Sequence, residues 1–204
     1  MKDLKSHWEN IYSTKEFEET SWFQEKPETS LKIIQSLGLS KKAQIIDIGG
    51  GNSFLVDHLL KLGYKNISVL DISEMALEKA KERLGEKSEQ VNWICSDVTE
   101  YNFEQEFELW HDRAAFHFLT EDSQVENYIS RLKTSLRSGG YFILGTFSEN
   151  GPDKCSGIEI RKYSSMDLQE LFEKDFEIVR LENLDHKTPW DAVQNFTFGL
   201  FRKK

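Results

Sequence analysis

Short apolar runs alternate with amphipathic stretches along most of this chain. The runs are rich in β-branched and aromatic residues, which is typical of buried strands, and strands are predicted at residues 44–48, 66–70, 91–95, 107–111 and 141–146. Between these runs, apolar residues recur at helical spacing, and helices are predicted over residues 29–37, 54–62, 73–84 and 125–136. Three of these helices are followed by a glycine that acts as a stop signal, namely Gly38, Gly63 and Gly85. Such alternation predicts a parallel sheet covered by helices.

The last part of the chain departs from this alternation. After a helix predicted at residues 167–172, two strands are predicted at 176–181 and 196–201, with only a loop between them. The chain has 204 residues, which is enough to build one domain with a sizeable core and short for two domains. We therefore predict a single α/β domain whose doubly wound, mostly parallel, seven-stranded sheet closes with a C-terminal antiparallel strand pair.

An aromatic and acidic segment precedes this α/β unit. We divide the chain into an N-terminal helical cap or lid, residues 1–38, and a main domain, residues 39–204. Trp8, Tyr12 and Trp22 favour a lid that folds over a bound ligand. Hydrophobic docking of an extra helix on the core is the alternative, and the two are compatible.

The most informative stretch joins the first predicted strand to the helix after it. It contains Asp47 followed by the run Gly49–Gly51, and glycine removes the Cβ atom where a backbone turns sharply beside a ligand. The second predicted strand is followed directly by Asp71. A glycine loop with an acid about 20 residues further on holds an adenosine-containing cofactor, because the acid accepts hydrogen bonds from the ribose hydroxyls.

Two residues indicate which cofactor this is. Phe54 stands where a dinucleotide site has a third small residue beside the pyrophosphate. Asp47 places a negative charge two residues before the first glycine, where a pyrophosphate would be repelled. These features disfavour a nicotinamide dehydrogenase and favour a cationic cofactor.

At these residues the chain resembles the class I S-adenosylmethionine-dependent methyltransferases, whose first motif is Asp-x-Gly-x-Gly. Asp47, Gly49 and Gly51 match this motif, whereas Ser53 departs from the third glycine that often follows. The resemblance implies a Rossmann-like fold, S-adenosylmethionine as the cofactor and S-adenosylhomocysteine as its product. Residues 110–119 also look like a segment of generically described bacterial methyltransferase-domain proteins.

The resemblance further implies which residues contact the cofactor. Asp71 would hold the ribose hydroxyls with Ile72 beside the adenine, and the pair Asp97–Val98 would meet the adenine edge. His111, after the fourth strand, lies where the methionine part of the cofactor and the acceptor come together in this fold. Trp22 is our choice for an aromatic contact with the sulfonium. Each of these has a plain alternative as a structural residue at a strand end or in the lid.

Methyl transfer by in-line displacement asks mainly that the acceptor be held at near-attack distance, with a base where the acceptor carries a proton. Asp112 lies at the same strand end as His111. If residues 112–119 begin a helix, Arg113 and His117 share one face, so that His117 acts as a base and Arg113 as an anion clamp. His186, in the loop predicted between the last two strands, is a second base candidate. The alternatives are a purely structural helix start at residues 112–119, with His117 as a core histidine, and a surface position for His186.

Composition limits the partners. The net charge of −9 argues against a nucleic-acid substrate, because phosphate contacts require clustered Lys and Arg. No apolar stretch approaches the ~20 residues that span a membrane. Cys95 and Cys155 have no metal-ligand spacing and suggest free thiols in a reducing cytosol, so we expect a cytoplasmic protein without a metal site.

We therefore expect methyl transfer from S-adenosylmethionine to a small-molecule acceptor, which is a thiol, another soft nucleophile or a carboxylate. A protein-lysine N-methyltransferase is the first alternative, because the N-terminal aromatic pattern is similar to that of such enzymes. A non-catalytic cofactor-binding module is the alternative from another class, since binding and transfer use different residues. A deep pocket lined by Arg113, His117 and Tyr163 would favour the small molecule, and an open acidic groove would favour a lysine-bearing protein.

Overall fold

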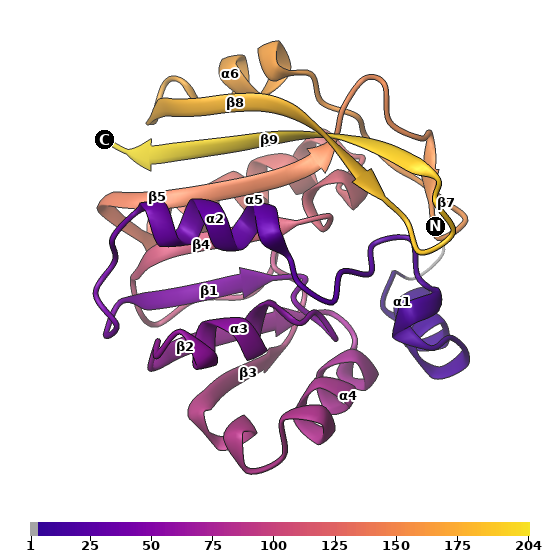
Figure 1. Cartoon of the computed structure of the whole chain (residues 1–204). Helices are drawn as coiled ribbons and strands as arrows, with labels where there is room; N and C mark the ends of the chain where they lie inside the picture. The colour runs from indigo at the N-terminus through magenta and orange to yellow at the C-terminus, as the bar shows by residue number, and fades with distance from the viewer. Residues whose placement is uncertain (1–3) are drawn as a thin grey trace.

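One seven-stranded sheet runs through the protein, and the computed structural model describes residues 4–204 of the chain (Figure 1). The strand order is β3-β2-β1-β4-β5-β9-β8. The parallel strands are β1 (Gln44–Ile48), β2 (Asn66–Asp71), β3 (Val91–Cys95), β4 (Phe107–Arg113) and β5 (Leu136–Phe147). β9 (Val193–Lys203) is antiparallel to β5, and β8 (Phe176–Lys187) is antiparallel to β9. The predicted doubly wound sheet with a closing antiparallel pair is thus confirmed.

Helices cover both faces of the sheet because neighbouring residues of each central strand are apolar on both sides. Ile45 packs against helices α2 (Glu28–Ser36), α3 (Leu55–Lys61) and α4 (Glu74–Leu84) in one core cluster. Ile46 and Trp110 pack against α5 (Asp122–Ser135) and α6 (Ser165–Phe172) in the other. This two-sided burial explains why the strands appear as continuous apolar runs rather than as alternating patterns.

Helix α1 (Leu4–Thr14) lies beyond the carboxyl ends of the parallel strands, and the short 3-10 helix η1 (Phe17–Glu19) follows it (Figure 1). The first three residues of the predicted segment 1–38 lie outside the described residues. Glu9 attaches α1 to the start of α4, where its carboxylate accepts hydrogen bonds from the backbone N–H of Glu74 (2.7 Å) and Met75 (3.1 Å) and from the Ser73 hydroxyl (3.1 Å). A carboxylate at a helix N-terminus is favourable because the unpaired N–H groups there carry partial positive charge.

The chain beyond β4 differs from the sequence prediction. The hypothesis of a helix over residues 112–119 is wrong. β4 continues to Arg113, and Ala114 then takes a left-handed conformation (φ 70°) that ends the strand. Only a short 3-10 helix, η3 (Phe116–Phe118), follows. Arg113 and His117 therefore do not share a helix face.

The closing strands are longer than predicted. β8 and β9 pair as far as Lys187 and Val193, so His186 lies in a strand and not in a loop. This extension carries mostly polar residues, and cross-strand hydrogen bonds rather than an apolar pattern hold it, which is why the sequence did not indicate it. β6 (Lys154–Cys155) and β7 (Ile158–Glu159) form a small separate hairpin. Within residues 4–204, the helices are all too short or too polar to cross a membrane.

Candidate active site

A pocket opens where the parallel strands end, between the sheet and α1. Its empty volume is about 880 Å³, a figure that includes the open space at its mouth. The wall under the ends of β1, β2 and β3 carries Gly49, Asp71, Ile72, Asp97 and Val98. The cover and the opposite wall are mainly aromatic and carry Trp8, Tyr12, Trp22, Phe118, Phe147 and Phe196, with Arg113 and Cys155 among them.

The glycine loop after β1 leaves room that side chains would occupy. Gly49 and Gly51 have positive φ angles of 62° and 36°. A Cβ atom on Gly49 would lie 2.6 Å from the Cβ atom of Ala115, and one on Gly51 would lie 2.7 Å from the Asp71 carboxylate. Contacts this short are not tolerated, so the loop needs glycine both for its conformation and for its closeness to Asp71.

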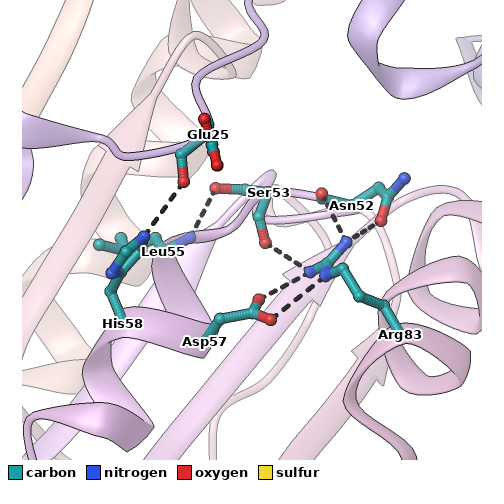
Figure 2. A network of polar contacts seen from close by, with 7 residues as sticks. All are labelled: Glu25, Asn52, Ser53, Leu55, Asp57, His58 and Arg83. Carbon is teal, nitrogen blue, oxygen red and sulfur yellow. Dashed lines mark hydrogen bonds and ion pairs between the residues drawn. The ribbon is translucent and has the colours of Figure 1, made fainter.

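Arg83, from the last turn of α4, holds this loop in place (Figure 2). Its guanidinium donates to the backbone oxygens of Ser53 (2.9 Å) and Asn52 (3.0 Å) and to the Asn52 side chain, and it pairs with Asp57 at 2.9 Å. The same group lies 4.3 Å above the ring of Phe54. Phe54, which replaces the small residue of a dinucleotide site, thus packs beneath a cation. The sequence contained no signal for Arg83, which appeared there as one charged residue of an amphipathic helix.

Asp71 and Asp97 offer acceptors suited to an adenosine. The Asp71 side chain is buried, and its Oδ1 accepts a hydrogen bond from the backbone N–H of Ser73 at 2.9 Å. The Oδ1 of Asp97 accepts hydrogen bonds from the backbone N–H (2.8 Å) and the hydroxyl (2.7 Å) of Thr99. Ile72 and Val98 line the pocket between these acids with apolar surface. Hydroxyl-accepting carboxylates, apolar walls and the glycine cradle together fit the adenosine half of S-adenosylmethionine.

The affinity for this cofactor is expected to fall at acid pH. Burial raises the pKa of Asp71 to about 7, assisted by the negative charges of Asp47 and Glu9 and opposed by the Ser73 N–H. Ribose hydroxyls donate to the carboxylate form, so binding favours the deprotonated acid. We expect the affinity for S-adenosylhomocysteine to be constant above pH 7 and to fall by up to about tenfold per pH unit below it. Calorimetric titration between pH 5.5 and 8.5 measures this dependence, and Asp71→Asn should remove it.

His111 lies behind the glycine loop rather than in the main pocket. Its Nδ1 donates to Asp47 Oδ1 at 2.7 Å, and its Nε2 is 2.8 Å from the hydroxyl of Ser30 on α2. All three side chains are buried. They border a narrow recess that adjoins the main pocket at Gly49 and Arg113. The hydrogen-bonded chain connects β4, β1 and α2, and thereby orients the acid that begins the glycine motif.

Asp112 points to the opposite face of the sheet and does not line the pocket. Its side chain is fully buried, and Oδ1 accepts from the backbone N–H groups of Ala115 (3.0 Å) and Phe116 (3.2 Å). Oδ2 accepts from the hydroxyl of Tyr128 at 2.8 Å. Burial raises the pKa of Asp112 to about 6, against the effect of the Tyr128 hydrogen bond. The side chain therefore holds the turn that follows β4.

Neither candidate base histidine lines the pocket. His117 is fully buried and stacks on Phe147, with ring centroids 4.5 Å apart. Both of its ring nitrogens lack a hydrogen-bond partner among residues 4–204, and burial lowers its pKa to about 3. His186 donates from Nε2 to the backbone oxygen of Ser21 at 2.7 Å, and so attaches the segment before Trp22 to β8. The base role of both residues stays a prediction.

Replacing His117 by leucine tests that role. We expect His117→Leu to leave S-adenosylhomocysteine affinity and methyl transfer unchanged and to raise the free energy of unfolding by about 1 kcal/mol, because two buried polar nitrogens without partners are removed. Urea denaturation and calorimetric titration measure the two effects. Lost turnover with intact cofactor binding would instead establish His117 as a base.

Arg113 reaches the pocket from the end of β4. Its Nη1 donates to the backbone oxygen of Trp22 at 3.0 Å, whereas its buried Nη2 has no hydrogen-bond partner within the described part of the chain. The guanidinium lies 5.4 Å from the ring of Phe196. Burial lowers the pKa of Arg113 to about 10, which leaves the side chain positively charged at neutral pH. Trp22, which meets Trp8 edge-on at 5.6 Å, also lines the pocket.

Comparisons with known proteins agree with this geometry. A family model described as “Methyltransferase domain” matches residues 45–140. The chain is 32% identical over 111 residues to malonyl-[acyl-carrier protein] O-methyltransferase 1 of Ilyobacter polytropus, a match that covers 54% of this chain but only 40% of that protein. It is 26% identical over 186 residues to EEF1A lysine methyltransferase 2 of Danio rerio, covering 87% of this chain and 70% of that protein.

A solved structure extends the likeness to nearly the whole chain. It is the 1,6-didemethyltoxoflavin-N1-methyltransferase of Burkholderia thailandensis with bound 1,6-didemethyltoxoflavin and S-adenosylhomocysteine. The TM-score is 0.74 at 20% sequence identity, and the match covers 98% of this chain and 87% of that one. The shared fold therefore includes both the α1 segment and the closing strand pair.

Proposed function

We propose that this chain is a class I S-adenosylmethionine-dependent methyltransferase, and that it transfers the methyl group of S-adenosylmethionine to a small-molecule acceptor. The cofactor supplies an electrophilic methyl group when bound. Asp71 and Asp97 would hold its adenosine half, and the glycine loop, held by Arg83, would allow its close approach. The remaining requirement is a nucleophile held in line with the methyl group.

The part of the pocket beyond the adenosine acids supports a small molecule. It is walled by aromatic side chains from the N-terminal segment, η3, β5 and β9, namely Trp8, Trp22, Phe118, Phe147 and Phe196. Such a chamber encloses a compact ligand and excludes water around it. Of the three residues expected to line a small-molecule pocket, Arg113 does so, whereas His117 and Tyr163 do not.

The charge of the chamber argues against a lysine acceptor. The acids that line the pocket among residues 4–204 are Asp71 and Asp97, at the adenosine end, while Arg113 is the charged side chain at the other end. A lysine ammonium entering there would meet a like charge in an apolar surrounding, which is unfavourable. The similarity to the Danio rerio lysine methyltransferase over 87% of the chain keeps protein lysine as the second candidate.

Calorimetric titration with S-adenosylhomocysteine, with NAD as the control ligand, tests the cofactor assignment. Saturable binding of S-adenosylhomocysteine alone is expected. Labelled methyl transfer to a panel of small thiols and carboxylic acids, set beside lysine-containing peptides, then separates the two acceptor classes. Labelling of the peptides alone would overturn the small-molecule proposal, and no binding of S-adenosylhomocysteine would overturn the methyltransferase assignment.

A further inference from the structure

Arg113 is a partly buried cation, and its buried Nη2 atom leaves its bonding incomplete. One guanidinium nitrogen donates to the Trp22 backbone, and the other, Nη2, has no hydrogen-bond partner within residues 4–204. A buried donor without a partner costs free energy, and more so when it is charged. A ligand with an anionic oxygen would supply the missing acceptor, because a charge-assisted hydrogen bond from Arg to a carboxylate or phosphate oxygen is stronger than a neutral one.

The position of Arg113 separates it from the adenosine site. The cofactor acids Asp71 and Asp97 follow β2 and β3, whereas Arg113 ends β4 on the other side of β1. Its guanidinium lies near Phe196 of β9, and its charge acts on Cys155 of the β6–β7 hairpin. Arg113 thus faces the aromatic chamber assigned to the acceptor.

The chamber also lacks a base suited to neutral pH in the described part of the chain. His117 and His186 do not line it. Burial raises the pKa of Cys155 to about 11 and that of Tyr12 well above its ordinary value, so both stay protonated. An ammonium or an alcohol would have to lose a proton before attacking the methyl group, and no side chain there is placed to accept it. A carboxylic acid enters already ionised.

Resting on the proposed function, we infer that the acceptor is a carboxylate, held by Arg113 Nη2 through one oxygen and methylated on the other to give a methyl ester. A lone pair of the free oxygen forms the new O–C bond as the C–S bond of the cofactor breaks, and that electron pair returns to sulfur. The carboxylate and the sulfonium both become neutral, and no proton moves. Such a reaction needs a cation to hold the carboxylate but no base, which agrees with the side chains that line the chamber.

The amino-acid end of the cofactor is a second source of a carboxylate, and the test distinguishes the two. Wild-type protein and Arg113→Gln are titrated with S-adenosylhomocysteine and with 5′-methylthioadenosine, which lacks the amino-acid end. We expect the variant to bind both ligands within about threefold of the wild type, since its cofactor acids are untouched. Arg180→Gln, which changes an exposed arginine outside the pocket, is the matched control.

The acceptor arm uses S-adenosylhomocysteine-loaded protein and a panel of aromatic and aliphatic carboxylic acids, each beside its primary amide. We expect at least one acid to bind at least about tenfold more tightly than its amide, and Arg113→Gln to abolish this preference while Arg180→Gln retains it. With labelled S-adenosylmethionine, the same acid should yield a base-labile methyl ester.

Two results would overturn the inference while leaving the methyltransferase assignment intact. One is a loss of S-adenosylhomocysteine affinity in Arg113→Gln with unchanged 5′-methylthioadenosine affinity, which would assign Arg113 to the cofactor. The other is a panel in which no acid binds better than its amide. Failure of the wild-type protein to bind S-adenosylhomocysteine would instead remove the proposed function on which the inference rests.

Discussion

Asp71→Ala is expected to weaken S-adenosylhomocysteine binding by about 100-fold or more while the protein stays folded. The carboxylate would accept hydrogen bonds from two ribose hydroxyls, and charge-assisted bonds contribute about 1.5–3 kcal/mol each. The fold should tolerate the change because Asp71 is buried close to the carboxylates of Asp47 and Glu9, which disfavour its charge. Calorimetric titration measures the affinity, and thermal denaturation measures the fold.

The control for this prediction is Asp153→Ala, which removes an acid from an exposed position outside the pocket and should leave binding unchanged. Asp71→Asn keeps the shape of the side chain and should retain part of the affinity. An Asp71→Ala protein that binds S-adenosylhomocysteine within threefold of the wild type would show that the ribose lies elsewhere.

Asp112→Ala is expected to reduce the free energy of unfolding by about 3 kcal/mol. The change would leave the backbone N–H groups of Ala115 and Phe116 and the Tyr128 hydroxyl without their buried acceptor, and each such loss costs about 1–3 kcal/mol. Tyr128 also accepts a hydrogen bond from the Trp110 indole at 2.9 Å, so the disturbance reaches the core on the α5 side of the sheet. For a chain of this length the midpoint of thermal unfolding should fall by roughly 6–12 °C.

This experiment also decides whether Asp112 is catalytic. Asp112→Asn keeps an acceptor for the turn and should cost less stability than the alanine variant, with methyl transfer largely retained. A folded Asp112→Ala protein of unchanged stability that has lost methyl transfer would contradict the structural role and support the catalytic one.

Much of the cofactor site was predictable because it follows from local patterns. The glycine run, Asp71 and Asp97 each come within two residues of the end of a predicted strand, and right-handed crossovers bring the carboxyl ends of parallel strands to one edge of the sheet. The turn after β4 was not predictable in this way. In the sequence, Asp112 is one more acid at the end of a strand. Only the packed structure shows that it accepts hydrogen bonds from the backbone N–H groups of Ala115 and Phe116.

The sequence by itself determined the order of strands and helices, the doubly wound sheet, the glycine loop and the acids suited to an adenosine, because apolar periodicity and strand-end position act over a few residues. The tertiary structure alone decided that Arg83 holds the glycine loop, that Glu9 attaches α1 beside Asp71, and that Arg113 faces an aromatic chamber. It also placed His117 in the core and His186 in a strand. These arrangements depend on side-chain direction and on contacts between residues far apart in the chain, which only the packing of the elements specifies.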